Sequence, residues 1–258
     1  MGLVDAHCHF DFPEFDGQRA AIMDQLASAG IDRIVIPGVR EQDWDRVKRV
    51  SSAHRGIHYC LGLHPWFIDD HEESALESLR QQLQARPEGC VALGECGLDR
   101  IHGDLDRQQW WFEAQVEMAR DLGWPLVVHS VKTHDEVLAT LKQYEFDSPV
   151  LLHGFSGSEQ QAQKLADFGA FIGVGGVITH DRARKTRRAI ASLPLSALVL
   201  ETDAPDMPPA GVEKGANSPV RLKQILGSLL ELRKESEEEV VSALEDNVSR
   251  LYRWERKD

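Results

Sequence analysis

The chain alternates between short apolar runs and longer segments of helical periodicity, and this alternation limits its possible folds more than any other feature. Eight apolar runs are each followed by a helical pattern. The runs are residues 3–10, 33–38, 57–65, 90–95, 125–129, 149–153, 171–174 and 197–203. The helical segments are residues 18–29, 42–54, 72–85, 106–122, 133–143, 158–168, 182–191 and 218–233. Short, almost entirely apolar strands are typical of a parallel sheet covered on both faces.

Eight strand-then-helix units predict an α/β fold, a closed (β/α)8 TIM barrel. The alternative is an open doubly wound sheet, but no glycine-rich phosphate loop follows the first run. We expect one domain over residues 1–258, with a short C-terminal helical extension that starts at a capping box, residues 236–239. The proline-rich residues 204–209 open a loop that we expect over the mouth of the barrel.

Composition favours a water-soluble enzyme. Apolar residues make up 42% of the 258, and no apolar run approaches the roughly 18–20 residues that a membrane span needs. The N-terminus lacks a basic segment before an apolar stretch, so we expect a cytoplasmic protein without membrane association. Nothing in the sequence indicates an obligate protein partner. The four cysteines form no C-x-x-C pair and are expected to be free, buried thiols.

The formal charge of −13 argues against binding of a polyanion through a broad, positively charged surface. It does not exclude a phosphate substrate, because bound divalent cations would supply positive charge where it is needed.

Residues that bind metals in other proteins fall at the ends of five of the apolar runs. His7 and His9, two residues apart, end the first run, and a short motif of this kind is weak evidence alone. Four further residues end later runs: Glu95, His129, His153 and Asp203. The carboxyl ends of all barrel strands converge on one mouth, which would bring these six side chains together.

Six such side chains are enough for two divalent metal ions. In this interpretation His7, His9 and Asp203 hold one ion, and His129 and His153 hold the other. Glu95 lies between them, since a carboxylate can bridge two ions roughly 3.5–4 Å apart. The sequence leaves the metal open among Zn, Mg and Mn.

Five sequence blocks resemble the TatD family of metal-dependent hydrolases, which belongs to the amidohydrolase-like barrels. The blocks are DAHCHFD (residues 5–11), GLHP (62–65), GECGLD (94–99), HGFSGS (153–158) and ETDAP (201–205). The resemblance spans almost the whole chain. It implies the same six metal ligands, marks His64 as a phosphate or substrate contact, and implies deoxyribonuclease activity, which for some members is 3′→5′ exonuclease activity on single strands.

One position departs from the family pattern. Members commonly carry His-Ser/Thr-Arg after the fifth strand, whereas this chain has His129, Ser130, Val131 and Lys132. Lys132 can replace the charge of the arginine but not its bidentate geometry, so the nuclease interpretation is weakened more than the hydrolase one.

Two further clusters have ordinary structural interpretations. Trp110, Trp111 and Phe112 are adjacent, so they cannot all face one groove, and packing is favoured over base stacking. A basic run follows the seventh strand: Arg182, Arg184, Lys185, Arg187 and Arg188. We expect a solvated helix face there, although its start would lie near the mouth.

The sequence therefore predicts a metal-dependent phosphodiester hydrolase that acts on single-stranded nucleic acid through an activated water. Asp203 would orient that water and accept its proton, while His64 and Lys132 would contact the substrate. Two alternatives remain open: hydrolysis of an amide, ester or lactone of a small molecule by the same centre, and a binding protein without catalysis.

Overall fold

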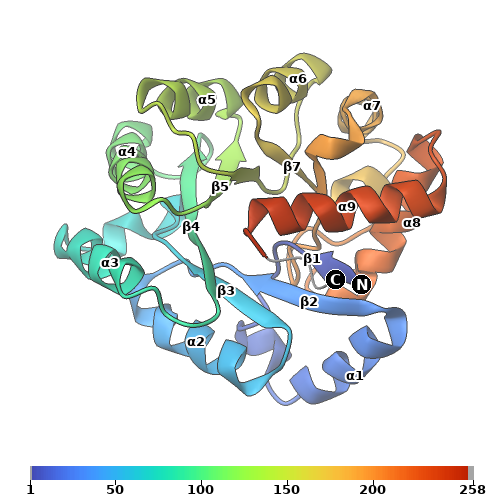
Figure 1. Cartoon of the computed structure of the whole chain (residues 1–258), viewed down its shortest axis with the longest axis horizontal. Coiled ribbons are helices and arrows are strands. Elements are labelled where there is room, and N and C mark those ends of the chain that lie inside the picture. Colours follow the sequence, from blue (N-terminus) through green and yellow to red (C-terminus); the bar gives the residue numbers. More distant parts are fainter. Residues whose placement is uncertain (1, 255–258) are drawn as a thin grey trace.

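The computed structural model of the protein describes residues 2–254 and forms an eight-stranded parallel sheet whose strand order follows the chain (Figure 1). The strands are β1 (Leu3–Asp5), β2 (Ile31–Ile36), β3 (Ile57–Leu61), β4 (Cys90–Asp99), β5 (Leu126–Val131), β6 (Val150–Leu152), β7 (Phe171–Val174) and β8 (Leu198–Leu200). Every strand pairs in parallel with its successor, as a barrel requires.

Helices connect and surround the strands. They are α1 (Arg19–Ala29), α2 (Trp44–Ala53), α3 (Ser74–Gln84), α4 (Leu105–Leu122), α5 (His134–Gln143), α6 (Glu159–Phe168), α7 (Arg184–Ser192), α8 (Leu222–Leu232) and α9 (Glu237–Leu251). Short 3-10 helices lie at η1 (Pro13–Phe15), η2 (Glu41–Asp43), η3 (Pro65–Asp70), η4 (Gly176–Thr179), η5 (Leu195–Ala197) and η6 (Pro219–Arg221). This architecture confirms the predicted (β/α)8 fold.

The barrel is closed by hydrogen bonds between the ends of β1 and β8 and the residues that follow them. The Ala6 amide donates to the Leu200 carbonyl at 2.9 Å, and the Asp203 amide donates to the His7 carbonyl at 2.9 Å. The buried Asp5 carboxylate accepts from the Thr202 amide, also at 2.9 Å. This seam joins residues nearly 200 positions apart and brings two predicted site segments together.

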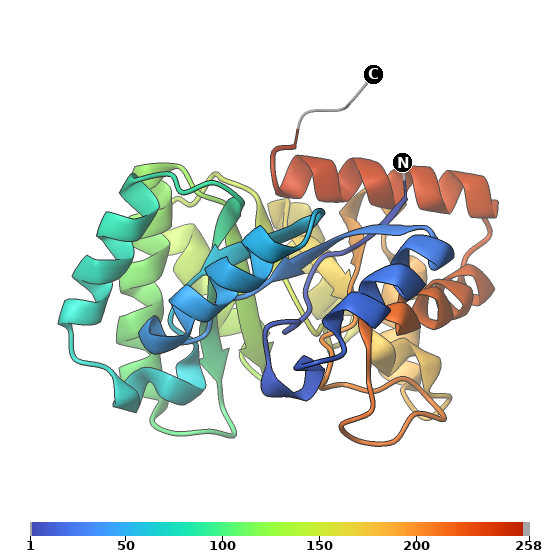
Figure 2. The ribbon, with the colours of Figure 1, turned by 90° about the horizontal axis from the view of Figure 1, so that it is seen from below.

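Two apolar cores fill the molecule. The larger lies between the strands and the surrounding helices, and the smaller occupies the inside of the barrel. Val248, Leu251 and Tyr252 belong to this inner core, so the end of α9 seals the barrel at the end where the strands begin. Figure 2 shows α9 at this end, with the loop after β8 (orange) at the other.

The C-terminal extension is longer than the sequence pattern indicated. The capping box at Ser236 and Glu239 starts α9 as predicted, but the helix continues to Leu251. The Tyr252 hydroxyl then donates to the Ala6 carbonyl at 2.7 Å, in a buried position. The extension is therefore part of the barrel core and not an appendage.

Some predicted boundaries were wrong. β1 ends at Asp5 and β8 at Leu200, so His7, His9 and Asp203 lie in the segments beyond the strands. These segments still make the backbone hydrogen bonds of the seam. The basic helix α7 begins at Arg184, which leaves Arg182 in the preceding turn.

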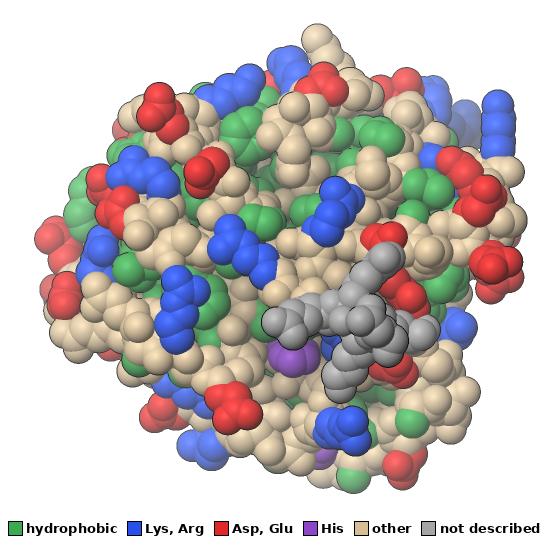
Figure 3. Space-filling view, viewed as in Figure 1, with side chains coloured by type: hydrophobic (Ala, Val, Ile, Leu, Met, Phe, Trp, Pro, Cys, Tyr) green, Lys and Arg blue, Asp and Glu red, His purple; other side chains and the backbone are tan. Residues whose placement is uncertain are grey.

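The cysteines and the charged surface residues lie largely where the sequence indicated. The four cysteines are free; Cys8, Cys60 and Cys96 are buried and Cys90 is partly buried. None of the described helices is sufficiently long and apolar to span a bilayer. Acidic and basic side chains are interspersed on the face that carries α9 (Figure 3).

Two adjacent tryptophans of α4 provide a test of the outer core. Trp111 is 3% exposed, as is typical of core packing, whereas Trp110 is 45% exposed. We expect Trp111→Ala to lower the free energy of unfolding by about 3–5 kcal/mol, the range for removing a buried aromatic side chain. Trp110→Ala should lower the free energy of unfolding by about 1 kcal/mol or less. Urea denaturation measures both, and equal losses would contradict this packing.

Candidate metal centre

The mouth of the barrel gathers imidazole and carboxylate side chains from elements far apart in the sequence. Glu95 and His129 lie within β4 and β5. The other members follow β1, β3, β6 and β8, and all are at least nine-tenths buried: His7, His9, His64, His153 and Asp203. The structure thus brings together all six predicted ligands and His64.

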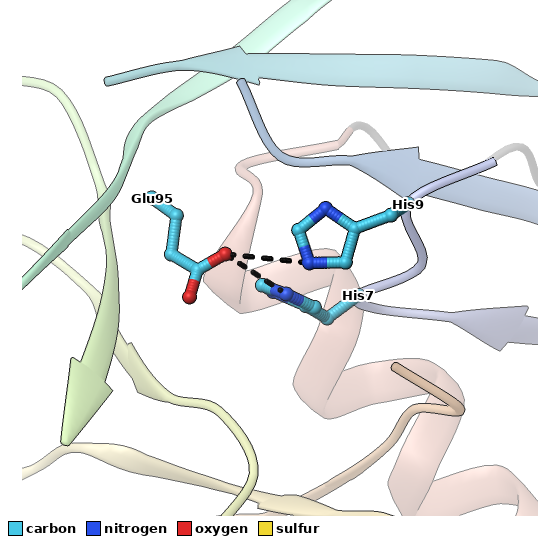
Figure 4. Close-up of side chains that lie close together, drawn as sticks. All are labelled: His7, His9 and Glu95. Carbon is cyan, nitrogen blue, oxygen red and sulfur yellow. Dashed lines mark ion pairs between the residues drawn. The ribbon is translucent and has the colours of Figure 1, made fainter. Parts of the chain in front are cut away.

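A first group of atoms surrounds one carboxylate oxygen of Glu95. His7 Nε2 lies 3.3 Å from Glu95 Oε2, and His9 Nε2 lies 3.6 Å from the same oxygen (Figure 4). Asp203 Oδ1 lies 3.4 Å from His7 Nε2 and 3.5 Å from His9 Nε2. Four potential ligand atoms therefore converge on one point.

A second group surrounds the other oxygen. Glu95 Oε1 lies 2.7 Å from His153 Nε2 and 3.1 Å from His129 Nδ1. The two imidazole nitrogens are themselves 3.2 Å apart. Because each oxygen of Glu95 faces a different group, this carboxylate lies between the two clusters, in the place where a bridging ligand would be needed.

A glycine allows the strands that carry Glu95 and His129 to lie close together. Gly97, two residues after Glu95, has a φ of +135° and pairs with His129 between β4 and β5. A Cβ atom at this position would collide with the His129 carbonyl. A residue without a side chain therefore allows β4 to continue beside β5 at the mouth.

Asp99, which sequence reasoning left without a role, orients His129. Its Oδ2 lies 3.0 Å from His129 Nε2, and hydrogen bonds from His129 and Trp66 hold the pKa of Asp99 below its ordinary value although burial alone would raise it. With Nε2 donating to this carboxylate, His129 presents Nδ1 to the cluster. The sequence did contain a signal, since Asp99 is the last residue of the third block, GECGLD.

His64 has the opposite orientation. Its Nδ1 accepts a hydrogen bond from the Trp66 amide at 3.1 Å, so its proton is on Nε2, which lies 3.1 Å from Glu95 Oε1. Burial lowers the pKa of His64 to about 4, and the imidazole is therefore neutral near pH 7. His64 thus presents a hydrogen-bond donor to the site, not a lone pair.

The first group suits a cation. His7 Nε2, Glu95 Oε2 and Asp203 Oδ1 are buried and have no hydrogen-bond partner among the described residues. Burial alone would lower the pKa of His7, but Glu95 and Asp203 raise it well above its ordinary value. The negative charges of the two carboxylates thus favour a positive charge at this point, and a divalent ion would supply it.

The second group behaves similarly. Burial alone would lower the pKa of His129, but hydrogen bonds with Asp99 and Glu95 raise it to about 9. A cation bound at Nδ1 would replace the proton there. Burial alone would also raise the pKa of Glu95, but His153 and His64 hold it well below its usual range, so Glu95 is a carboxylate.

Glu201 is a buried acid that sequence reasoning also missed. Its Oε1 accepts a hydrogen bond from the Gly154 amide, while Oε2 has no partner among the described residues. Gly173 leaves room for this side chain, since a Cβ atom there would collide with the carboxylate. Burial raises the pKa of Glu201 to about 8.

The predicted basic residues lie outside the cluster. Lys132 follows β5 on the rim, is exposed, and has a φ of 56°. Arg182 and Arg184 are exposed near the start of α7, whereas Arg188 pairs with Glu159 at 3.2 Å. The structure therefore places Lys132 near the mouth without contact to the clustered histidines.

This geometry, a (β/α)8 barrel with a histidine and carboxylate centre at its mouth, is that of a metal-dependent hydrolase. The family profile described as "TatD related DNase" matches residues 4–253. The chain therefore belongs to the TatD-related DNase family.

Individual relatives support this assignment. The metal-dependent hydrolase YjjV of Escherichia coli K12 is 41% identical over 252 residues, which cover 97% of each chain. The crystal structure of YjjV matches with a TM-score of 0.93, covering 97% of this chain and 98% of that one. The 3′-5′ ssDNA/RNA exonuclease TatD of Klebsiella pneumoniae is 29% identical over 258 residues and 97% of each chain.

The buried Glu201 predicts how stability depends on pH without metal. Its pKa rises from an ordinary 4.5 to about 8 on folding, so the folded state binds its proton more tightly. The stability of the wild type relative to Glu201→Gln should therefore fall as pH rises from about 5 to about 8. Urea denaturation of both proteins in chelator measures this difference, and a constant value would contradict the burial effect.

Proposed function

We propose that the protein is a two-metal phosphodiesterase that degrades single-stranded nucleic acid. The observation that carries the proposal is the division of donors around Glu95, with Oε2 facing His7 and His9 and Oε1 facing His129 and His153. Two-metal centres of this kind suit in-line displacement at phosphorus. The family description and the name of the Klebsiella relative supply the substrate class.

The six residues would divide between two divalent ions. His7, His9 and Asp203 would hold one ion and His129 and His153 the other, with Glu95 bridging. The donor set of nitrogens and carboxylate oxygens is compatible with Zn, and Mn or Mg remain alternatives. When bound, the ions would lower the pKa of a water molecule and stabilise negative charge on the phosphoryl group.

The protein's own side chains would complete the reaction. Burial alone would raise the pKa of Asp203, but His7 and His9 hold it far below the usual range, so this carboxylate stays ionised and can orient the attacking water and accept its proton. His64, fixed as an Nε2 donor, would hydrogen-bond a phosphoryl oxygen. Lys132, on the rim, would pair with a phosphate of the substrate as a point charge.

A second candidate is hydrolysis of an amide, ester or lactone by the same centre. The departure at Lys132 favours this candidate, because the chain lacks the bidentate arginine that suits a phosphate. Crystal structures of two dihydroorotases share the fold at 18% and 15% identity, a level of similarity that concerns the fold alone.

Asp203→Asn tests the catalytic assignment. The amide can still offer an oxygen to an ion but cannot accept a proton, so we expect a folded protein that retains metal and loses about 10²–10⁴-fold in turnover of single-stranded DNA. Metal analysis of the purified variant and initial rates on oligonucleotides measure both effects. A loss of less than roughly tenfold with metal retained would make Asp203 a structural ligand only.

Lys132→Ala tests the choice between phosphodiester and neutral substrates. We expect weaker binding of single-stranded DNA and no change with a neutral ester, because only the former carries a phosphate. With about two or three phosphates contacted, log affinity should fall against log salt with a slope of magnitude roughly 1.4–2.1, and the variant should lose about 0.7 of it.

Lys142→Ala is the matched control, since Lys142 is an exposed lysine in the last turn of α5, away from the mouth. It should leave both substrates unchanged. Equal losses on DNA and ester in Lys132→Ala would favour the amide or ester candidate.

A further inference from the structure

The rim beside the metal centre carries an aromatic surface that the proposed reaction does not use. Trp66, in η3, is 47% exposed, and its ring centroid lies 4.2 Å from that of His102 at an interplanar angle of 31°. The His102 side chain is 48% exposed. Ile101, its neighbour, is 61% exposed. Together Trp66 and His102 form an open aromatic pair facing solvent.

This pair is held rigidly against the centre. Trp66 Nε1 donates to Asp99 Oδ2 at 2.7 Å, the same oxygen that lies 3.0 Å from His129 Nε2. The Trp66 amide donates to His64 Nδ1, and the indole centroid lies 5.9 Å from that of His129. The exposed indole therefore lies beside the ring of His129, a proposed metal ligand. One hydrogen bond from its side chain and one from its backbone fix its orientation.

We propose that the Trp66–His102 pair is a stacking surface for the nucleobase next to the scissile phosphate of a single-stranded nucleic acid. This inference rests on the proposed nuclease function and extends it to a base subsite. A base is separated from its own phosphate by one sugar, which suits a stacking surface one ring away from the centre that would hold the phosphate.

The net charge of the chain also favours a nucleobase as the occupant of this surface. The chain has a net charge of −13, so contacts to many phosphates are disfavoured and affinity must come from another source. Stacking of a base on an aromatic ring is uncharged and tolerates any sequence. Bases within a duplex are already stacked on each other, so this surface selects single strands.

The alternative role for Trp66 is positioning, in which the indole only orients Asp99 and, through it, His129. The two roles differ in what the rest of the substrate must contain. A positioning residue would affect every phosphodiester alike, whereas a stacking residue would affect only substrates that carry a base at the adjacent nucleotide.

The test compares two single-stranded oligodeoxynucleotides that differ at the 3′-terminal nucleotide, one with thymine and one with an abasic tetrahydrofuran residue. With the metal-loaded full chain, Trp66→Ala should lower kcat/KM on the thymine strand about 5- to 150-fold, the range that stacking of one base supplies. On the abasic strand the same substitution removes only the hydrogen bond to Asp99, which Trp66→Phe removes too, so both variants should lose the same factor there, and that factor should be smaller than the loss of Trp66→Ala on the thymine strand.

Two variants and a binding measurement complete the test. Trp66→Phe keeps a ring but removes the Nε1 donor, so it should retain most of the preference for the thymine strand. Trp110→Ala, a change to another exposed tryptophan, should leave both strands unaffected. In the Asp203→Asn background, fluorescence anisotropy should show that Trp66→Ala weakens binding of the labelled thymine strand and not of the abasic strand.

The outcomes separate the two proposals. Equal losses on both strands in Trp66→Ala would overturn the stacking inference and leave the nuclease function standing, with Trp66 as a positioning residue. A Trp66→Ala variant as active as the wild type on the thymine strand would overturn it as well. If the metal-loaded wild type cleaves neither strand, the nuclease proposal fails and the base subsite fails with it.

Discussion

The seam between β1 and β8 is the constraint on which the rest of the structure depends. Backbone hydrogen bonds from Ala6 and Asp203 close the barrel, and the buried Asp5 carboxylate fixes Thr202 across the same joint. Because His7 and Asp203 themselves take part in the seam, the bonds that complete the fold also set the spacing of these two candidate ligands. Closure of the barrel therefore also brings these two candidate ligands together.

Above the seam, the Glu95 carboxylate lies between the two groups of histidines. Its two oxygens face different histidines, and its negative charge helps to raise the pKa of His7 and of His129 above their ordinary values. The neighbouring residues set which ring nitrogen is available: Asp99 turns Nδ1 of His129 inward, and the Trp66 amide turns the Nε2 proton of His64 inward. Two histidines of the same mouth thus acquire opposite chemical character from a single hydrogen bond each.

The sequence predicted the barrel and the gathering of all six residues because strand period and strand ends are local properties. It could not predict the orientation of the histidines, since the short first strand ends at Asp5 and the His7 and His9 rings stand at 86° to each other. The roles of Asp99 and Glu201 depend on partners in other strands. The exposure of Trp66 depends on the rim loops, whose course no periodicity encodes.

The position of α9 has a consequence for the order in which the protein can be made. Tyr252 bonds the carbonyl of Ala6, a residue 246 positions earlier, and Asp203 must meet His7 across nearly the whole chain. Contacts of such sequence separation form late, since closing long loops costs entropy before any contact repays it. The N-terminal histidines are therefore synthesised before Asp203 and Tyr252, so the contacts that close and seal the barrel can form only after most of the chain has been made.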